Sequence, residues 1–245
     1  MNSGYYAACA GLMAQTQALD LVANNLANLG TTGYRGARPS FRALLAGTAH
    51  AVSANPLNRA INNFSVLSGS TVDLSSGNLE HTGNPLDLAI EGSGFFAVQT
   101  RAGVRYTRNG SFQVSTKGQL ITGSGDPVLG ETGPIVLPSG PISISDDGTI
   151  SSAGAVAGKL RLVEFVPGAS PVAEGSSYYS APAKAVRPAA GSSVEQGTLE
   201  ASNVNPVAAT VSLIVVQRQA DMMERALSAY YNDINRVAAE DLPHV

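Results

Sequence analysis

The sequence predicts an α+β fold, in which a discontinuous helical domain from N- and C-terminal coiled-coil-like helices carries an inserted all-β antiparallel domain. Two observations predict this class. Apolar residues recur with heptad spacing near both ends of the 245-residue chain, which is typical of helices that pack along a seam. Between the ends, the pattern changes to short alternating runs separated by glycine-containing turns, which is typical of antiparallel hairpins.

Residues 1–35 are expected to form the N-terminal helix of the helical domain. Tyr5, Leu12, Leu19 and Leu26 are seven residues apart, as on one edge of a coiled-coil seam. A seam of this kind needs a partner helix. Leu12, Leu19 and Leu26 are therefore predicted to lie in a subunit interface.

The stretch DLVANNLANLGTTGYRG, residues 20–36, places three asparagines along this apolar helix. Asparagine amides donate and accept hydrogen bonds, and polar residues in a helix seam fix its register. We therefore predict that Asn24, Asn25 and Asn28 lie between subunits; the alternative is that they face solvent. Gly33 is expected to let the chain leave the helix, and Tyr34 to anchor this exit with its hydroxyl at a polar rim.

Residues 206–245 are predicted to form the C-terminal helix of the same domain. Asn205 suits the position of the helix cap, and Pro206 suits the first turn. Four heptads follow without a break, which indicates a coiled-coil helix. The apolar heptad positions predicted to lie in the subunit interface are Leu213, Val216, Ala220, Met223, Leu227, Tyr230 and Ile234.

Residues 81–190 are predicted to form the antiparallel β domain. Its candidate strands include FFAVQT, VRYT, SFQVST, QLIT and GKLRLVEFV. Turns are expected at Arg101-Ala102-Gly103, Asn109-Gly110, Lys117-Gly118 and Asp147-Gly148, because such pairs favour hairpins. Residues 36–80 are interpreted as an extended linker region, and residues 191–205 as an extended return segment.

The composition excludes several classes of protein. Only 13% of the residues are charged and the formal net charge is −3, so electrostatic binding of nucleic acid is not expected. So little charge indicates that partners cover much of the surface. No apolar run approaches the roughly 20 residues of a membrane span. No cleavable signal peptide is expected, because residues 1–19 contain no Lys or Arg and such peptides begin with a basic region.

No catalytic site, cofactor or metal site is expected. The histidines at 50, 81 and 244 lack the spacing of metal ligands, and Cys9, the single cysteine, is expected to pack on the apolar side of its helix. The sequence GSGFF at 92–96 is similar to the start of a dinucleotide loop. It precedes a strand and not a helix, so a tight turn is the better interpretation.

Motifs at both ends and in the middle point to one family. VANNLANLGTTGYR (22–35) resembles the N-terminal motif of the axial proteins of the bacterial flagellum, and GTLEASNVNPVAATVSLIVVQRQADMMERAL (197–227) resembles their C-terminal motif. DLAIEGSGFFAVQT, YTRNGSFQVSTKGQLIT and GDPVLGETGPIVLP resemble the single β domain of the short rod proteins. The chain is identified as a member of the flagellar basal-body rod family, and its length and PVLG…GPI stretch favour a proximal rod subunit.

This resemblance implies a structural subunit, not an enzyme, of the periplasm-spanning drive shaft. Its partners would be copies of itself, other rod subunits and, during secretion, the flagellar type III export apparatus; neither nucleic acid nor direct membrane insertion is implied. A distal rod or hook-like subunit is the alternative within the class. A secreted β-domain binding module is the alternative from another class, although 6% aromatic residues and no Trp supply few stacking surfaces for sugars.

Overall fold

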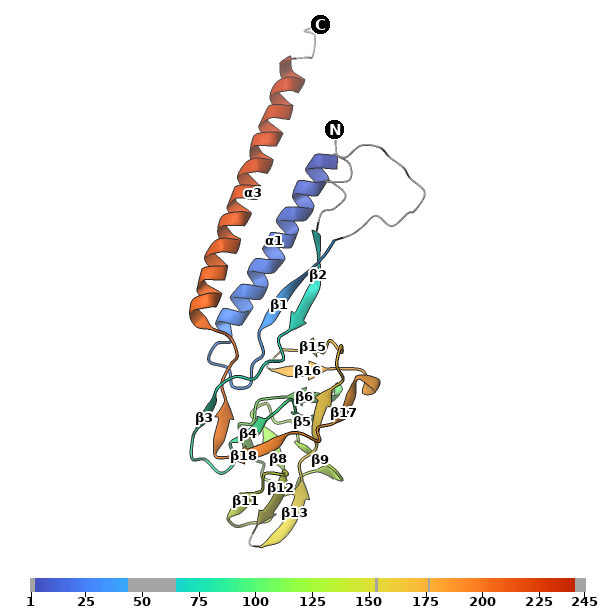
Figure 1. Cartoon of the computed structure of the whole chain (residues 1–245), viewed down its shortest axis with the longest axis vertical. Helices are drawn as coiled ribbons and strands as arrows, with labels where there is room; N and C mark the ends of the chain where they lie inside the picture. Colours follow the sequence, from blue (N-terminus) through green and yellow to red (C-terminus); the bar gives the residue numbers. More distant parts are fainter. Residues whose placement is uncertain (1–2, 44–64, 153, 176, 241–245) are drawn as a thin grey trace. The chain divides into compact units, whose positions relative to one another are not determined.

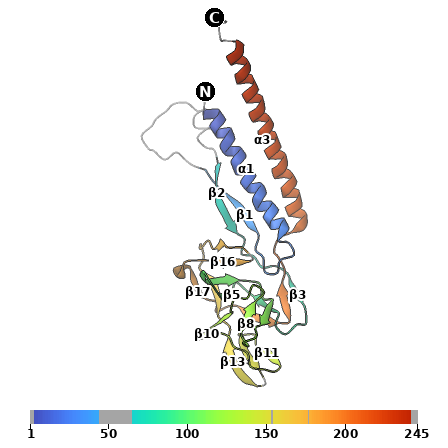
Figure 2. The same cartoon turned by 180° about the vertical axis from the view of Figure 1, so that it is seen from behind.

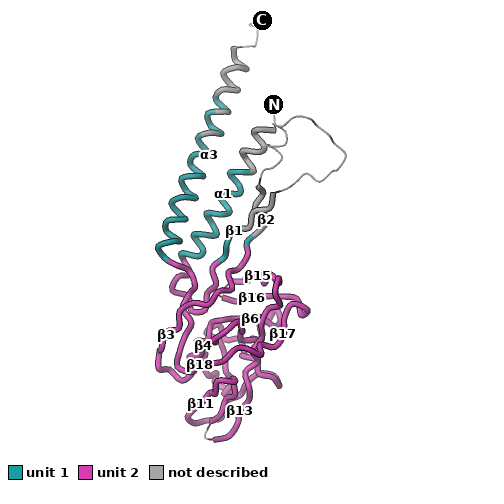
Figure 3. The backbone as a smooth tube through the Cα atoms, viewed as in Figure 1, with its two compact units in different colours: residues 1–26, 37–70, 206–245 teal, residues 27–36, 71–205 magenta. Residues whose placement is uncertain are grey.

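The computed structural model consists of two compact units (Figure 3). Unit 1 comprises residues 1–26, 37–70 and 206–245, and unit 2 comprises residues 27–36 and 71–205. The structure describes the backbone of residues 3–43, 65–152, 154–175 and 177–240, and the side chains of residues 11–38, 70–152, 154–175, 177–225, 227–229 and 231–232.

The predicted fold class is wrong, because the described chain is predominantly β and contains two α-helices. The helices do not form a helical domain by themselves. Unit 1 also contains strands β1 (Ala37–Ala43) and β2 (Ser65–Val72), which pair with each other. Both strands lie in the stretch that was interpreted as a linker, because the residues of that stretch show no clear hydrophobic periodicity. Figures 1 and 2 show this strand pair beside α1.

Helix α1 spans Ser3–Ala27. Its buried apolar side chains, Ala14, Ala18 and Val22, are four residues apart, as on one face of a straight helix. The predicted seam residues lie beside this face and are only half-buried: Leu12, Leu19 and Leu26. The heptad interpretation followed the largest apolar side chains, whereas the small alanines form the buried face. The side chain of Tyr5 lies outside the described residues.

Helix α3 spans Pro206–Glu240 and runs alongside α1 (Figure 1). Ala209 is buried, but the predicted heptad residues are half-buried: Leu213, Val216, Ala220, Met223 and Leu227. A packed coiled-coil seam would bury these side chains in facing holes. The predicted terminal coiled coil is therefore not what the structure displays. The side chains of Tyr230 and Ile234 lie outside the described residues.

Unit 2 is built from short strands, and each pair whose register is defined is antiparallel. The first strands are β3 (Leu79–His81), β4 (Leu88–Glu91), β5 (Phe95–Thr100), β6 (Gly103–Thr107), β7 (Phe112–Val114), β8 (Leu120–Thr122), β9 (Leu129–Gly130) and β10 (Gly133–Pro134). The remaining strands are β11 (Ile142–Ile144), β12 (Thr149–Ser152), β13 (Ala155–Lys159), β14 (Leu162–Phe165), β15 (Val172–Ala173), β16 (Tyr178–Ser180), β17 (Val186–Pro188), β18 (Ser193–Gln196) and β19 (Thr198–Glu200). A 3₁₀ turn, η1 (Ala183–Ala185), precedes β17.

The largest sheet has six strands in the order β15-β16-β6-β5-β14-β17. Two smaller pairs, β18 with β4 and β19 with β3, bring the return segment before α3 against the start of the β domain. The segment before α3 is thus held by backbone pairing and does not run as a free linker.

The hairpin turns predicted from the local sequence are correct where a strand pairs with the next strand in the sequence. Hairpins form at the predicted turns between β5 and β6, between β7 and β8, and between β11 and β12. The predicted hairpin at Asn109-Gly110 is wrong, since β6 pairs with β5 and β16 whereas β7 pairs with β8. Gly110 instead accepts a hydrogen bond from the backbone N–H of Leu88, at 3.1 Å. A non-local contact overrides the local turn signal here.

Two apolar clusters form the core of unit 2. Phe96 and Phe112 belong to the larger one, with ring centroids 5.1 Å apart. The smaller cluster contains Phe95 and Tyr179, with ring centroids 5.7 Å apart. The polar site described next adjoins the smaller cluster, because the guanidinium of Arg108 lies over the Phe95 ring, 4.9 Å from its centroid.

Candidate functional site

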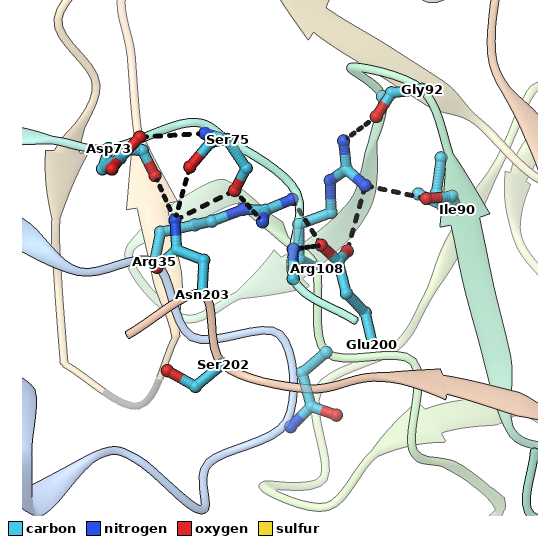
Figure 4. Close-up of polar contacts among 12 residues, drawn as sticks. Arg35, Asp73, Ser75, Ile90, Gly92, Arg108, Glu200, Ser202 and Asn203 are labelled. Atoms are coloured by element: carbon cyan, nitrogen blue, oxygen red, sulfur yellow. Dashed lines mark hydrogen bonds and ion pairs between the residues drawn. The ribbon is translucent and has the colours of Figure 1, made fainter. Parts of the chain in front are cut away.

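The most unusual polar feature of the described chain is a buried carboxylate between two buried arginines (Figure 4). Glu200, the last residue of β19, is 0% exposed, and Arg35 and Arg108 are 2% and 1% exposed. Glu200 Oε1 lies 2.7 Å from Arg35 Nη2, and Glu200 Oε2 lies 3.0 Å from Arg108 Nη1. We call these three residues the buried ion cluster.

Backbone carbonyls supply further acceptors to the cluster, although the buried Nε atoms of Arg35 and Arg108 have no hydrogen-bond partner among the described residues. Arg108 donates to the carbonyls of Ile90, at 2.9 Å, and of Gly92. Arg35 donates to the carbonyl of Ser75. These dipoles compensate the second positive charge, which Glu200 alone cannot neutralise. Without such partners, a buried guanidinium would cost several kcal/mol.

Electrostatics within the cluster are dominated by burial. Burial lowers the pKa of Arg108 to about 10, although Glu200 opposes this shift. Burial also raises the pKa of the Tyr179 phenol to about 12, and the backbone N–H of Arg35, which donates to this hydroxyl at 3.0 Å, partly offsets it. The three side chains of the cluster are shielded from solvent, so their arrangement suits a structural clamp.

Gly33 explains how the N-terminal motif reaches the cluster. Its φ angle is 65°, in the left-handed region that favours glycine. Its N–H donates to the backbone carbonyl of Glu200 at 2.7 Å. A Cβ atom at this position would lie 2.3 Å from the carbonyl carbon of Arg108 and 2.4 Å from the nitrogen of Asn109. Only glycine fits this close backbone approach without displacement.

Asn203, a few residues after Glu200, links the N- and C-terminal motifs through hydrogen bonds of its amide (Figure 4). Its Oδ1 accepts a hydrogen bond from the N–H of Gly36 at 2.8 Å. Its Nδ2 donates to the carbonyls of Asp73 and Ser75, both at 2.9 Å. One amide therefore joins the chain leaving α1, the segment after β2 and the segment before α3.

The three asparagines predicted for an interface, two in α1 and Asn28 directly after it, fall in different environments. Asn25 is half-buried, and its amide makes two bonds to the backbone of Ala37: Nδ2 donates to the carbonyl at 2.7 Å, and Oδ1 accepts from the N–H at 2.8 Å. Asn28 Oδ1 accepts a bond from the hydroxyl of Thr31 at 3.2 Å. Asn24 is exposed. The structure thus brings Asn25 into contact with its own chain, and the role of all three between subunits stays a prediction.

Tyr34 is half-buried, and burial raises the pKa of its phenol. Arg35, Arg108, Glu200 and Asn203 were missed as site residues. Arg35, Glu200 and Asn203 lie within the quoted terminal motifs. Their signal was that residues 21–34 and 201–217 carry no charge, so the charges of Arg35 and Glu200 stand at the ends of long uncharged stretches.

A further surface was also missed. Exposed apolar side chains follow one side of α3, opposite its half-buried residues. We call this set the exposed α3 face; it consists of Val207, Val211, Ile214, Val215 and Met222. Its signal was present in the sequence as apolar residues outside the heptad positions.

Two further observations bear on function. Among the described residues, no group of three or more His, Cys, Asp or Glu side chains is placed to hold a metal ion. Neither described helix combines the length and apolar character that a membrane span requires.

Models of three families match this chain. The flagella basal body rod protein model matches residues 6–35, the D1 domain model of the flagellar hook protein FlgE/F/G matches residues 89–152, and the C-terminal model of the flagellar basal body rod FlgEFG protein matches residues 195–232. The first and third matched segments contain Arg35 and Glu200. Together they define the class as an axial protein of the flagellum.

Individual relatives narrow the class. The chain is 32% identical to flagellar basal-body rod protein FlgF of Caulobacter vibrioides, over 99% of this chain and 98% of the relative. It is 36% identical to FlgF of Escherichia coli, over 88% and 89%, and 33% identical to flagellar basal-body rod protein FlgG of Buchnera aphidicola, over 89% and 92%. The chain belongs to the flagellar basal-body rod protein family, as a structural rod subunit of the F type.

Proposed function

We propose that this subunit assembles into the proximal rod through its terminal helices and transmits torque passively, without an active site. The observation that carries the proposal is the exposed α3 face. Val207 is 72% exposed, Val211 56% and Met222 63%. Burying a valine or methionine fully is worth about 1.5–3 kcal/mol, so a neighbouring subunit that covers this face gains substantial free energy.

The geometry of α3 argues for contacts on two sides. An α-helix has 3.6 residues per turn. Val207, Val211 and Ile214 therefore lie on one side of α3. Leu213 and Val216 lie on another side. The first set is exposed and the second is half-buried. Residues 206–216 of α3 contain no charged side chain, and a helical segment that is apolar on most of its circumference is normally buried in its working state. We therefore propose that both sides are covered in the rod.

The proposed interface includes the residues that the sequence suggested. They are Leu12, Leu19, Asn24, Asn25, Leu26, Asn28, Gly33, Tyr34, Leu213, Val216, Ala220, Met223, Leu227, Tyr230 and Ile234. To these we add the exposed α3 face. Copies of the chain and other rod subunits are the proposed partners, and family membership supports association with rod components.

The proposed site of action is the rod where it crosses the periplasm. We further propose that the flagellar type III apparatus exports the chain unfolded. The single cysteine, which allows no internal disulfide, supports an exported protein that folds without disulfides.

The test replaces one residue of the exposed α3 face by a charge. Val211→Lys is expected to reduce the amount of this subunit in purified basal bodies, because a buried unpaired ammonium is costly. Gln217→Lys, at another exposed position of α3, is the matched control and should incorporate normally. Equal incorporation of both variants would contradict assembly through this face. Cryo-electron microscopy of the same basal bodies distinguishes a proximal from a distal position along the axis.

A further inference from the structure

We propose that a polar cleft in unit 2 receives an extended, uncharged peptide segment of a neighbouring rod subunit; this rests on the proposed function. The cleft has a volume of about 300 Å³. That lies at the lower end of the range of about 300–1,000 Å³ for ligand pockets. None of its residues belongs to the buried ion cluster.

Four separate segments build the polar cleft. One follows α1, one includes the end of β6 and the residues after it, one includes the end of β8 and the residues after it, and one begins β16. The side chains that line it from these segments are Asn28, Thr31, Thr107, Asn109, Thr122 and Tyr178. Because these segments are far apart in the sequence, the cleft exists only in the folded unit.

Internal hydrogen bonds hold the walls of the cleft in place. The hydroxyls of Thr122 and Tyr178 lie 2.9 Å apart, and the Tyr178 hydroxyl donates to Asp126 Oδ2 at 3.0 Å. The N–H of Asn109 donates to the hydroxyl of Thr107 at 3.0 Å. Thr107 is 0% exposed and Thr122 is 7% exposed. A wall that is already ordered loses little conformational entropy when a partner binds.

The chemistry of the lining selects the partner. Its side chains are hydroxyls and amides, with no Asp, Glu, Lys or Arg among them. Hydroxyls and amides both donate and accept hydrogen bonds, as the N–H and C=O groups of a peptide backbone require. An anion or a phosphorylated ligand would lose hydration here without gaining a positive charge. The cleft therefore fits an uncharged segment.

Energetics favour a segment that is already tethered nearby. Each hydrogen bond of this kind contributes only modestly in water, because water makes the same bonds. Assembly through another surface raises the effective concentration of a neighbour's segment to about the millimolar range. A neighbouring subunit is therefore a better occupant than a freely diffusing peptide.

The test places a large side chain in the cleft at a position where the fold can accept it. Gly123 lines the cleft, its φ angle is not positive, and a Cβ atom there would meet nothing within 4 Å. Gly158, in β13, has the same properties but does not line the cleft. Gly123→Glu should therefore reduce incorporation into basal bodies by about tenfold or more, as the loss of an important contact does. Gly158→Glu should incorporate like the wild type.

Thermal unfolding of both purified chains checks that the fold is intact. If Gly123→Glu lowers Tm, Ser124→Glu replaces it, since Ser124 also lines the cleft and is exposed. Normal incorporation of the folded cleft variant overturns the proposal. If Val211→Lys still fails to incorporate in the same experiment, the assembly proposal stands and only the cleft proposal fails.

A photoreactive residue at position 124 identifies the occupant. The expected product is a crosslink to an uncharged segment of another axial subunit in intact basal bodies. The absence of any crosslink to an axial subunit, or a crosslink to a charged segment, overturns the proposal.

Discussion

The carboxylate of Glu200 lies 2.7 Å from the guanidinium of Arg35, and neither side chain is exposed to solvent. Arg35 belongs to the motif that follows α1, and Glu200 to the motif that precedes α3. The pair therefore joins the segment that follows α1 to the last strand before α3, and both of these belong to unit 2. In Figure 4, Arg108 lies beside the other oxygen of the same carboxylate.

Glu200→Gln should strongly destabilise the protein. The substitution keeps the shape of the side chain but leaves two buried guanidinium groups without their counter-charge. Breaking a buried ion pair in this way costs about 3–5 kcal/mol. Urea unfolding of the purified chain, followed by circular dichroism, measures the loss.

The control for this prediction is an exposed ion pair. Glu174 lies 2.6 Å from Arg105, and its side chain is 41% exposed. Glu174→Gln should leave the unfolding midpoint almost unchanged, because water screens such a pair. Similar effects of the two substitutions would mean that burial of Glu200 is not decisive.

Local signals were enough to find several elements but not this cluster. Lys117-Gly118 and Asp147-Gly148 identify their hairpins because a tight turn depends on neighbouring residues. Arg35 and Glu200 meet only because the pairs β19–β3 and β18–β4 fold the return segment back. No period or spacing in the sequence encodes that pairing. The exposed α3 face was missed for another reason: the heptad positions coincide with the half-buried side of the helix.

Gly33→Ala should destabilise the chain, whereas Gly30→Ala should not. A residue other than glycine at a positive φ costs about 1–2 kcal/mol, and the new methyl group must also displace the backbone of Arg108 and Asn109. At Gly30 a Cβ atom would meet nothing within 4 Å, and the φ angle is not positive. Thermal unfolding of the two variants provides the comparison. A Tm for Gly33→Ala equal to that of Gly30→Ala would refute the close backbone approach.

Asn203→Ala should lower the free energy of unfolding and should also increase local opening of the backbone around Gly36. The N–H of Gly36 and the carbonyl of Asp73 would lose the bond to Asn203, whereas the carbonyl of Ser75 would keep its bond from Arg35. An unsatisfied buried polar group costs about 1–3 kcal/mol. Hydrogen exchange at the Gly36 amide should accelerate, while the exposed Asn78→Ala serves as control. Unchanged protection of Gly36 would show that Asn203 does not hold this segment.

Tyr179 should make stability fall at alkaline pH. Its ordinary pKa of 10.0 rises to about 12 on burial, so between these values the folded chain keeps a proton that the unfolded chain has lost. Stability is therefore fully present below pH 10.0 and is lost as the pH rises toward about 12. Arg108 acts in the opposite direction, because burial lowers its pKa to about 10 and the folded chain releases this proton before the unfolded chain does.

Tyr179→Phe separates these two effects, since it removes the phenol and leaves Arg108 in place. The variant should be less stable than the wild type at neutral pH, because the backbone N–H of Arg35 loses its acceptor. This deficit should shrink by roughly 1 kcal/mol between about pH 9 and pH 11, as the wild type loses the contribution of its protonated phenol. Urea unfolding at each pH measures the deficit, with the exposed Tyr231→Phe as control. A deficit that stays constant over this interval would show that the Tyr179 proton is not linked to folding.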